Sequence, residues 1–524
     1  MSYKKSPGLG KQEKTKTGYL LGFFQLFFVV PQWVQMMILT VERQQMPVAE
    51  ARLLFLLQKT VDFFQNCGRI REIHEKAGFP MAKPFPKHKP ISAPRIMVLG
   101  FAGLILLGAL VLMLPISSAE NQFTPFLDAL FTSTTATCVT GLVVRDTATY
   151  WSPFGHAVIL LLIQVGGLGV ITIAASFTML AGKKLGLSQR SNMQEAVAAQ
   201  KLGGIAGLTA FLVKTTLLVE LLGAVALSPV FIRDFGFGRG IWMAVFTSIS
   251  AFCNAGIDLM GTTAPYSSMT GYLTDPLLNI SLMALIIIGG LGFLTWEDIR
   301  THKHHIRHYR MQSKVILTVS GILILAPALL FFFFEFTNLP LKERIWASLF
   351  QSITTRTAGF NTADLAAMSQ SGQFLMILLM LVGGSPGSTA GGMKTTTFAV
   401  LLGCAWAVFR KRESVQFFGR RIAQDVVATA ATLLTMYLGL CVSAAMVISA
   451  VEGLPLLTCL FETASAIATV GLTLGITPTL GVVSKCILIV LMYLGRVGGL
   501  TLIYAALSDK KQLGKLPLDK LTVG

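Results

Sequence analysis

One pattern of features occurs four times along this chain from residue 91 onward. Each copy has a long apolar stretch, a short apolar segment that ends in a glycine-containing loop, and a second apolar stretch with a Gly-Gly pair. Successive loop glycines are 115, 103 and 112 residues apart (256−141, 359−256, 471−359). The same features in the same order at a nearly constant interval are typical of a repeat architecture. The loop glycines are Gly141, Gly256, Gly359 and Gly471.

The apolar stretches have the length of membrane-crossing helices. Uncharged runs cover Ile96–Ser117, Ala157–Ala181 and Asn279–Thr295, and about 20 apolar residues are needed to cross the hydrocarbon core. Only 13% of the 524 residues are charged, whereas soluble domains carry about 25%. The sequence therefore predicts an all-α polytopic membrane protein.

The basic residues indicate the orientation of the chain. The net charge of +18 would also fit a nucleic-acid-binding protein, but Lys and Arg gather in the short loops 182–202, 299–315 and 409–421. Such an asymmetry follows the positive-inside rule, so we expect no nucleic-acid partner. At about 10–12 residues the short segments cannot cross the membrane, and re-entry places every basic linker on one side. We expect eight spanning helices and four re-entrant pore helices around one central ion pathway, in the cell membrane, with linkers and C-terminus cytoplasmic.

These features divide the chain into repeats and flanking segments. Residues 1–90 do not fit the pattern and are interpreted as an N-terminal extension of interfacial and cytoplasmic helices. The predicted boundaries are 91–185 for repeat 1, 200–300 for repeat 2, 313–410 for repeat 3, 424–508 for repeat 4 and 509–524 for a cytoplasmic tail.

The four glycine loops, defined as residues 139–141, 254–256, 357–359 and 469–471, are the candidate ion-binding site. A cation that leaves water needs replacement oxygens, and backbone carbonyls provide them without a fixed charge. Glycine allows the dihedral angles that turn these carbonyls inward. We expect the side chains of Thr140, Asn254, Thr357 and Thr469 to hold the loops by hydrogen bonds. The predicted K⁺-binding residues are Val139, Thr140, Gly141, Asn254, Ala255, Gly256, Thr357, Ala358, Gly359, Thr469, Val470 and Gly471.

A glycine-rich segment in repeat 3, residues 383–392, is a candidate gate. It contains five glycines and a proline, which disfavour a continuous helix, so it could block the pore or could form only a kink. Arg496 lies within the last apolar stretch and could latch this segment, or could be a snorkelling or paired arginine. The predicted gating residues are Gly384, Ser385, Pro386, Gly387, Gly391, Gly392 and Arg496.

Other polar residues near the loops have open roles. Arg356 and Glu462 either pair to brace the loops or face an outer vestibule, and Asp258 could raise the local cation concentration. His304, His305 and His308 look metal-like but are better interpreted as part of a solvated cytoplasmic loop.

Residues 91–524 resemble the Trk/Ktr/HKT superfamily of K⁺ transporters, most closely the bacterial KtrB type. The segments that carry the resemblance are 137–142, 250–258, 289–295, 354–362 and 469–472. The resemblance implies a K⁺ pathway, often influenced by Na⁺, with Gly141 favouring K⁺ because related plant proteins with serine there prefer Na⁺. It also implies a gating loop at 383–392, a homodimer with one pore per subunit, and regulation by a cytosolic nucleotide-binding RCK ring.

The sequence is thus interpreted as a channel-like K⁺ uptake subunit embedded in membrane lipid. The alternative within the same superfamily is a Na⁺ or Na⁺/K⁺ transporter. A carrier with inverted repeats is disfavoured because the basic linkers imply parallel repeats. No cluster of catalytic side chains lies in the apolar stretches, so we expect no enzyme activity. This chain lacks a nucleotide-binding motif, so a nucleotide would bind a separate subunit.

Overall fold

The computed structural model describes residues 93–180, 205–499 and 501. The chain divides into two compact units, Met1–Pro90 and Ile91–Gly524, and all described residues belong to the second. The predictions for residues 1–90 and for the tail 509–524 therefore lie outside the described residues. Within the second unit, nearly every element is a helix.

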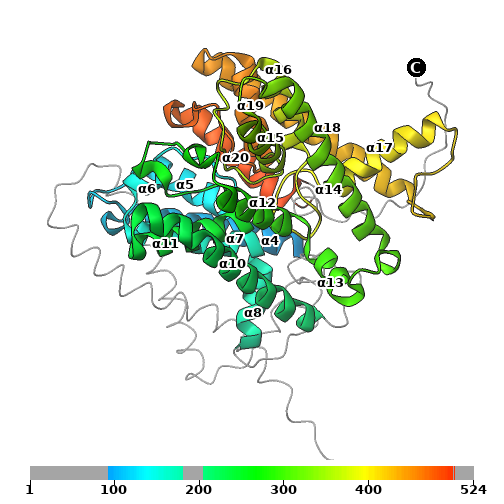
Figure 1. Cartoon of the computed structure of the whole chain (residues 1–524), viewed down its shortest axis with the longest axis horizontal. Coiled ribbons are helices and arrows are strands. Elements are labelled where there is room, and N and C mark those ends of the chain that lie inside the picture. Colours follow the sequence, from blue (N-terminus) through cyan, green and yellow to red (C-terminus); the bar gives the residue numbers. More distant parts are fainter. Residues whose placement is uncertain (1–92, 181–204, 500, 502–524) are drawn as a thin grey trace, which may run out of the picture. The chain divides into compact units, whose positions relative to one another are not determined.

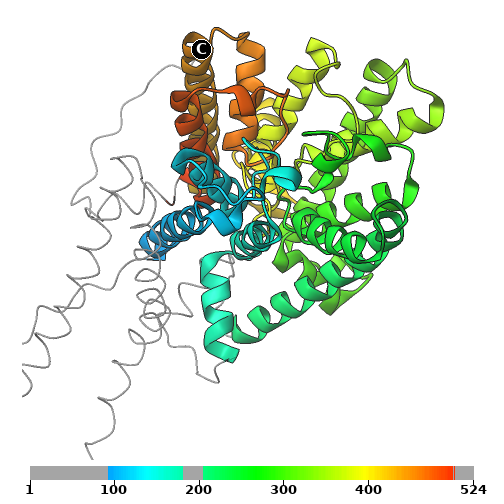
Figure 2. The same ribbon diagram turned by 90° about the vertical axis from the view of Figure 1, so that its left-hand side faces the viewer.

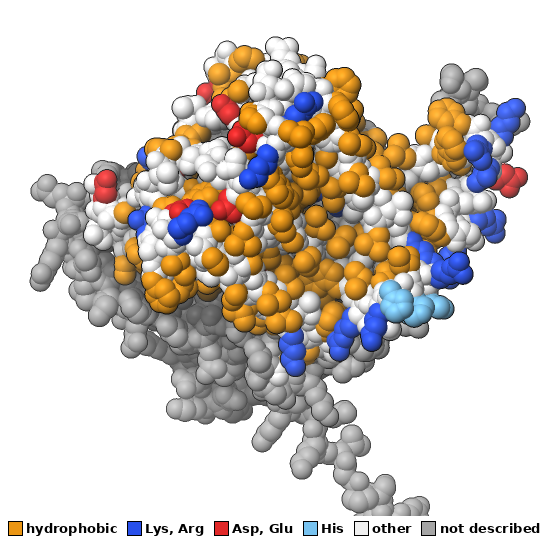
Figure 3. All heavy atoms as spheres, in the orientation of Figure 1, with side chains coloured by type: hydrophobic (Ala, Val, Ile, Leu, Met, Phe, Trp, Pro, Cys, Tyr) orange, Lys and Arg blue, Asp and Glu red, His pale blue; other side chains and the backbone are white. Residues whose placement is uncertain are grey.

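Each repeat begins with a long apolar helix. These helices are α4 (Ala93–Leu112), α10 (Ile205–Phe235), α14 (Met311–Leu330) with the π-helical η5 (Phe331–Glu335), and α18 (Gln424–Glu452). Among the described residues, these four are long and apolar enough to cross a membrane by length and composition. Exposed apolar side chains cover much of the surface in Figure 3, and basic side chains and histidines gather near α13 (Phe293–His302). This distribution fits a lipid-facing surface with one basic end.

A short, buried pore helix follows each long helix. α5 (Phe126–Cys138), α11 (Phe237–Phe252), α15 (Leu341–Thr354) and α19 (Leu456–Ile467) lie where the sequence places short helices. The first turns of α11 and α15 contain charged residues, Arg239 in α11 and Lys342, Glu343 and Arg344 in α15. Each pore helix packs against the long helix of its own repeat, as α10 and α11 do side by side in Figure 1.

A serine hydroxyl joins the pore helix to the long helix in three repeats. Ser133 donates to the Ile105 carbonyl at 2.7 Å, and Ser352 donates to the Ile324 carbonyl at 2.6 Å. Ser248 donates in the same way to the Glu220 carbonyl at 2.6 Å. Small residues at such crossings let helix backbones approach closely inside a membrane.

The final helix of each repeat is interrupted near its Gly-Gly pair. α7 (Pro153–Leu168) bends into α8 (Val170–Leu180) at Gly169, whose φ is +85°. α12 (Pro276–Gly290) meets α13 at 98°, with Gly292 at φ +87° between them. The sequence predicted one apolar stretch at each place, but glycine favours left-handed dihedrals that end an α-helix. In repeat 3, residues 382–394 separate α16 (Gln370–Leu381) from α17 (Thr395–Phe409), and in repeat 4 α20 (Val482–Val497) ends at Gly498.

Neighbouring repeats pack in a closed cycle. The helix after each glycine loop contacts the pore helix of the next repeat: α7 contacts α11, α12 contacts α15, α16 contacts α19, and α20 returns to α5. Figures 1 and 2 show the yellow segment after α16 running among the helices. This cycle places the four pore helices around a common centre.

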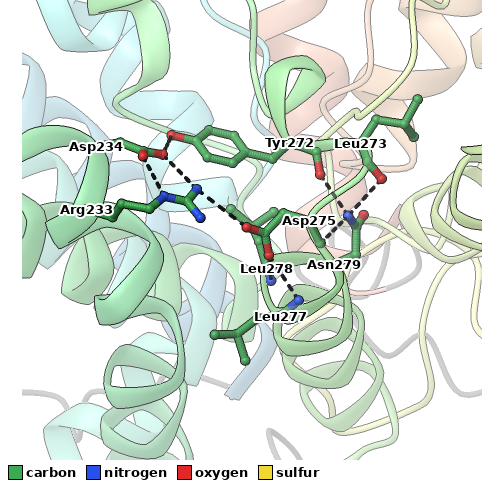
Figure 4. Close-up of polar contacts among 8 residues, drawn as sticks. All are labelled: Arg233, Asp234, Tyr272, Leu273, Asp275, Leu277, Leu278 and Asn279. Carbon is green, nitrogen blue, oxygen red and sulfur yellow. Dashed lines mark hydrogen bonds and ion pairs between the residues drawn. The ribbon is translucent and has the colours of Figure 1, made fainter.

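Short elements connect the helices at the two ends. One polar cluster fixes the end of α10 to the start of α12: Arg233 contacts Asp234 at 2.8 Å and Asp275 at 3.6 Å, and the Tyr272 hydroxyl donates to Asp234 (Figure 4). The remaining elements are α6 (Thr147–Tyr150), η1 (Pro115–Ser117), η2 (Met260–Thr262), η3 (Thr270–Tyr272), η4 (Ile306–His308), η6 (Thr477–Thr479), and a hairpin of β1 (Gln416–Phe417) and β2 (Arg420–Arg421).

Candidate ion-conduction site

The four glycine loops share one backbone conformation. Two residues before each loop glycine, a non-glycine residue has a positive φ: Val139 at +57°, Asn254 at +59°, Thr357 at +65° and Thr469 at +52°. The glycines themselves have φ values of +103°, +63°, +83° and +92°. Left-handed backbone at non-glycine residues is uncommon and costs energy, so its occurrence at one position in four repeats indicates a shared constraint.

The loops meet in a closed ring of backbone contacts. A Cβ added to Gly141 would lie 2.7 Å from the Ala255 carbonyl oxygen and 3.1 Å from the Gly471 Cα. Any side chain at this position would therefore collide with the neighbouring loops. The other contacts complete the ring: Gly256 lies against the Ala358 carbonyl, Gly359 against the Val470 carbonyl, and Gly471 against the Thr140 carbonyl. These contacts bring together eight of the twelve residues that the sequence singled out, the four glycines and the residue before each of them.

The side chains that hold the loops differ from those expected. The hydroxyls of Thr140, Thr357 and Thr469 have no hydrogen-bond partner among the described residues, so their predicted bracing role is wrong. The Asn254 amide does form contacts: it donates to the Arg356 carbonyl at 3.3 Å and accepts from Thr389 at 3.2 Å.

A buried hydroxyl in the last turn of each pore helix does the bracing instead. Thr135 accepts from the Gly141 N–H at 2.9 Å, and Ser465 accepts from the Gly471 N–H at 3.0 Å. Ser250 bonds both the N–H and the carbonyl of Ile257, and Thr354 donates to the Phe360 carbonyl. The signal was present in the sequence as a Ser or Thr five or six residues before each loop glycine.

A cavity of about 270 Å³ opens above the ring. All four loop glycines line it, together with Asp146, Asp258 and Asp364. Asp258 lies between α11 and α12, outside the long helices. Burial, and then the nearby charge of Asp146, raise the pKa of Asp258 to about 6. Carboxylates and all four loops therefore come together in this cavity.

The 383–392 segment lies against the loops, and none of its residues lines the cavity. The Thr389 hydroxyl donates to the Phe252 carbonyl at 3.0 Å, and a Cβ on Gly391 would overlap the Thr469 side chain. Backbone bonds attach the segment to repeat 2: Ser385 N–H to the Gly290 carbonyl at 3.0 Å, and Phe293 N–H to the Gly387 carbonyl at 2.7 Å. The segment is thus a non-helical stretch of chain that is hydrogen-bonded to repeat 2, and not a kink within a continuous helix.

Arg496 joins this segment to repeat 1. Its guanidinium donates to the Thr389 carbonyl and to the carbonyls of Gly166 and Gly167, the last at 3.0 Å. All its partners are carbonyl oxygens, and among the described residues it forms no ion pair. The arrangement excludes a snorkelling arginine, because the side chain is directed inward to the segment.

The other polar residues that the sequence singled out do not contact one another across the site. Arg356 and Glu462 do not pair: Arg356 donates to Ser320 at 2.9 Å, whereas Glu462 accepts from Thr473 and Thr477. The rings of His304 and His305 lie 4.2 Å apart between centroids and are tilted by 33°, just after the end of α13. No group of metal-ligating side chains occurs within the described ranges.

One family model and several known proteins are similar to this chain. A family model described as a cation transport protein, TrkH, matches residues 96–512. The potassium/sodium uptake protein NtpJ of Enterococcus hirae is 41% identical over 80% of this chain and 94% of its own length. The Ktr system potassium uptake protein B of Bacillus subtilis is 37% identical over 82% of this chain and 96% of its own length. The crystal structure of the potassium transporter TrkH from Vibrio parahaemolyticus shares the fold, with a TM-score of 0.64, 21% identity, and coverage of 93% of this chain and 96% of that chain.

The apolar helices, the closed cycle of repeats and these matches define an integral membrane transporter of cations rather than an enzyme. Within that class, the chain belongs to the TrkH family of cation transport proteins.

Proposed function

We propose that this protein takes up K⁺ across the cell membrane through a channel-like path with a backbone-carbonyl selectivity filter at the four glycine loops. Eight membrane crossings, two per repeat, and four re-entrant pore helices enclose this path. The observation that supports the proposal most strongly is the closed ring of loop carbonyls and glycines. All four pore helices end at these loops, so the negative ends of their dipoles favour a cation there.

The 383–392 segment and Arg496 form the proposed gate. The segment contacts two of the four loops, through Asn254 and Thr469, and Arg496 holds it to the carbonyls of the Gly166-Gly167 pair. Because the Arg496 bonds are charge-assisted, they are stronger than neutral hydrogen bonds. An ion leaving the loops toward the basic side has to pass this segment, so releasing it would open the path.

The names of two relatives bear on the transported ion. One relative is named for potassium and sodium and another for potassium, which leaves a Na⁺ or Na⁺/K⁺ transporter as the alternative. We propose a homodimer in membrane lipid, with a cytosolic RCK-type nucleotide-binding ring docked on the basic side and no nucleotide site in this chain.

Replacing Gly141 with serine tests the filter assignment. The added side chain would lie 2.7 Å from the Ala255 carbonyl oxygen, so it displaces one ligand of the ring. We expect Rb⁺ uptake into proteoliposomes to lose about tenfold of its preference over Na⁺, which corresponds to about 1.4 kcal/mol of differential binding. The matched control is Gly271→Ser, where nothing lies within 4 Å of the added atom. An unchanged K⁺ over Na⁺ preference in the Gly141 variant contradicts the filter assignment.

Asp258→Asn tests the vestibule. Because the pKa of Asp258 is raised to about 6, its carboxylate is charged above that pH and neutral below it. At low ionic strength and neutral external pH, we expect the variant to need about threefold more K⁺ for half-maximal uptake. Wild type should approach the variant as the external pH falls below about 6, and added salt should reduce the difference. The control is Asp425→Asn, which changes an exposed carboxylate at the start of α18. If wild type and both variants need the same K⁺ concentration for half-maximal uptake, Asp258 has no role in the vestibule.

A further inference from the structure

A carboxyl group lies inside the helical core next to the second glycine loop. Glu220 of α10 is 5% exposed, and its two carboxyl oxygens lie 3.0 and 3.2 Å from the Gln164 amide nitrogen. The Cys253 sulfur lies 3.9 Å from one of these oxygens. Cys253 immediately precedes Asn254, the first residue of the second glycine loop.

No basic side chain neutralises this carboxyl group among the described residues. α8 and α12, which pack against α10, contain no ionisable residue, and Lys214 of α10 itself is exposed. The other ionisable side chains near α10 lie elsewhere: His156 of α7 bonds the Thr147 carbonyl, and Arg239 of α11 lies at the opposite end of that helix from Cys253. Arg300 of α13 packs on the ring of Phe211, nine residues before Glu220 on α10. Arg496, the cation of the conduction site, is bound to the carbonyls of Thr389, Gly166 and Gly167 instead. An ionised carboxylate in this position would be strongly disfavoured.

The fold does not require a carboxyl group at this position. The Ser248 hydroxyl uses only the backbone carbonyl of Glu220, and the corresponding bonds in repeats 1 and 3 go to Ile105 and Ile324. An apolar side chain therefore serves the helix packing equally well in two other repeats. Glu220 therefore places an ionisable group at a position where repeats 1 and 3 have only an apolar isoleucine.

We propose that Glu220 is a proton-binding site that acts on ion conduction through Cys253. Gly167 packs so closely on Cys253 that an added Cβ would lie 2.6 Å from the sulfur, and the Gly167 carbonyl holds Arg496. Loss of the proton leaves a negative charge beside the second glycine loop, which attracts cations in the path and draws Arg496 away from Thr389. Conduction therefore rises when Glu220 is deprotonated. This inference rests on the proposed roles of the loops and Arg496.

The test measures Rb⁺ flux in proteoliposomes with equal pH on both sides, scanned from about pH 5.5 to 9, the range in which buried acids titrate. The Rb⁺ concentration is saturating, so the effect of the Asp258 charge on half-saturation does not change the measured flux. We expect wild-type flux to rise about threefold with pH, and Glu220→Gln to stay at the low-pH level throughout. Glu120→Gln, which changes an exposed carboxyl, should keep the wild-type profile. A wild-type profile in Glu220→Gln, or a flat profile in wild type, overturns the proposal, and a purely structural role would scale the flux equally at every pH.

A second variant covers the case in which Glu220→Gln does not assemble. Gln164→Leu keeps the carboxyl but removes the amide that donates to it, so the flux profile should move to higher pH. The infrared band of neutral carboxyls should contain a component that titrates at higher pH in Gln164→Leu than in wild type, and identical titration of this band in the two proteins would also overturn the proposal. These outcomes are distinguishable from a failure of the filter assignment. That failure would appear as an unchanged ion preference in Gly141→Ser and would not alter these pH profiles.

Discussion

Replacing Gly471 with alanine should reduce Rb⁺ or K⁺ uptake by at least tenfold. The new Cβ would overlap the Thr140 carbonyl oxygen and lie 2.7 Å from the Gly141 Cα, so the ring of loops cannot close. Both neighbours are backbone atoms, which cannot rotate away as a side chain would. A barrier increase of about 1.4 kcal/mol already gives a tenfold slower rate, and this overlap should exceed it. The measurement is initial uptake per molecule of purified protein in proteoliposomes.

Gly475→Ala is the matched control for this prediction. Its φ is +90°, close to the +92° of Gly471, but nothing lies within 4 Å of an added Cβ. Both variants therefore carry the same left-handed strain of about 1–2 kcal/mol. We expect the Gly475 variant to transport at nearly the wild-type rate. If both variants lose uptake equally, the need for glycine at position 471 comes from its left-handed backbone and not from the close contacts of the ring.

Replacing Arg496 with glutamine should raise the flux about tenfold. The substitution removes charge-assisted hydrogen bonds to the Thr389 carbonyl and to the Gly166-Gly167 carbonyls. Hydrogen bonds to charged groups contribute about 1.5–3 kcal/mol each, so loss of even one is large enough to shift a closed segment toward an open one. Arg496→Lys should give an intermediate flux, because an ammonium group lacks the planar fork that reaches several carbonyls at once.

Lys485→Gln controls for the loss of a positive charge from the same helix. Lys485 lies on α20 and contacts Asp128 at 3.4 Å, away from the 383–392 segment. Its substitution should leave the flux near wild type. A flux in Arg496→Gln at or below the wild-type level, with the protein correctly inserted, would reject the latch.

The sequence predicted the parts of the fold that repeat. The pore helices and the convergence of Gly141, Gly256, Gly359 and Gly471 follow from local signals, since a short apolar segment and a loop glycine recur at a nearly constant interval. The breaks at Gly169 and Gly292 were missed because hydropathy does not change where a glycine bends an apolar helix.

The errors at the site concern the partners of individual side chains. The hydroxyl of Thr140 stays without a partner while that of Thr135 braces the loop, and both are threonines only a few residues apart. Thr135 lies within α5, whereas Thr140 follows the left-handed residue Val139 at the end of that helix, so the two residues have different backbone conformations. The separation of Arg356 from Glu462 depends likewise on helix packing across repeats, which no local pattern encodes.

The central claim is that the carbonyl oxygens of the four glycine loops bind the transported cation. The most direct measurement is an experimental structure in Rb⁺ with the anomalous signal of the ion recorded. The account predicts Rb⁺ on the axis between the carbonyls of Thr140, Ala255, Ala358 and Val470, where the loops already meet. Rb⁺ bound elsewhere in a transporting protein, with the ring empty, would contradict it.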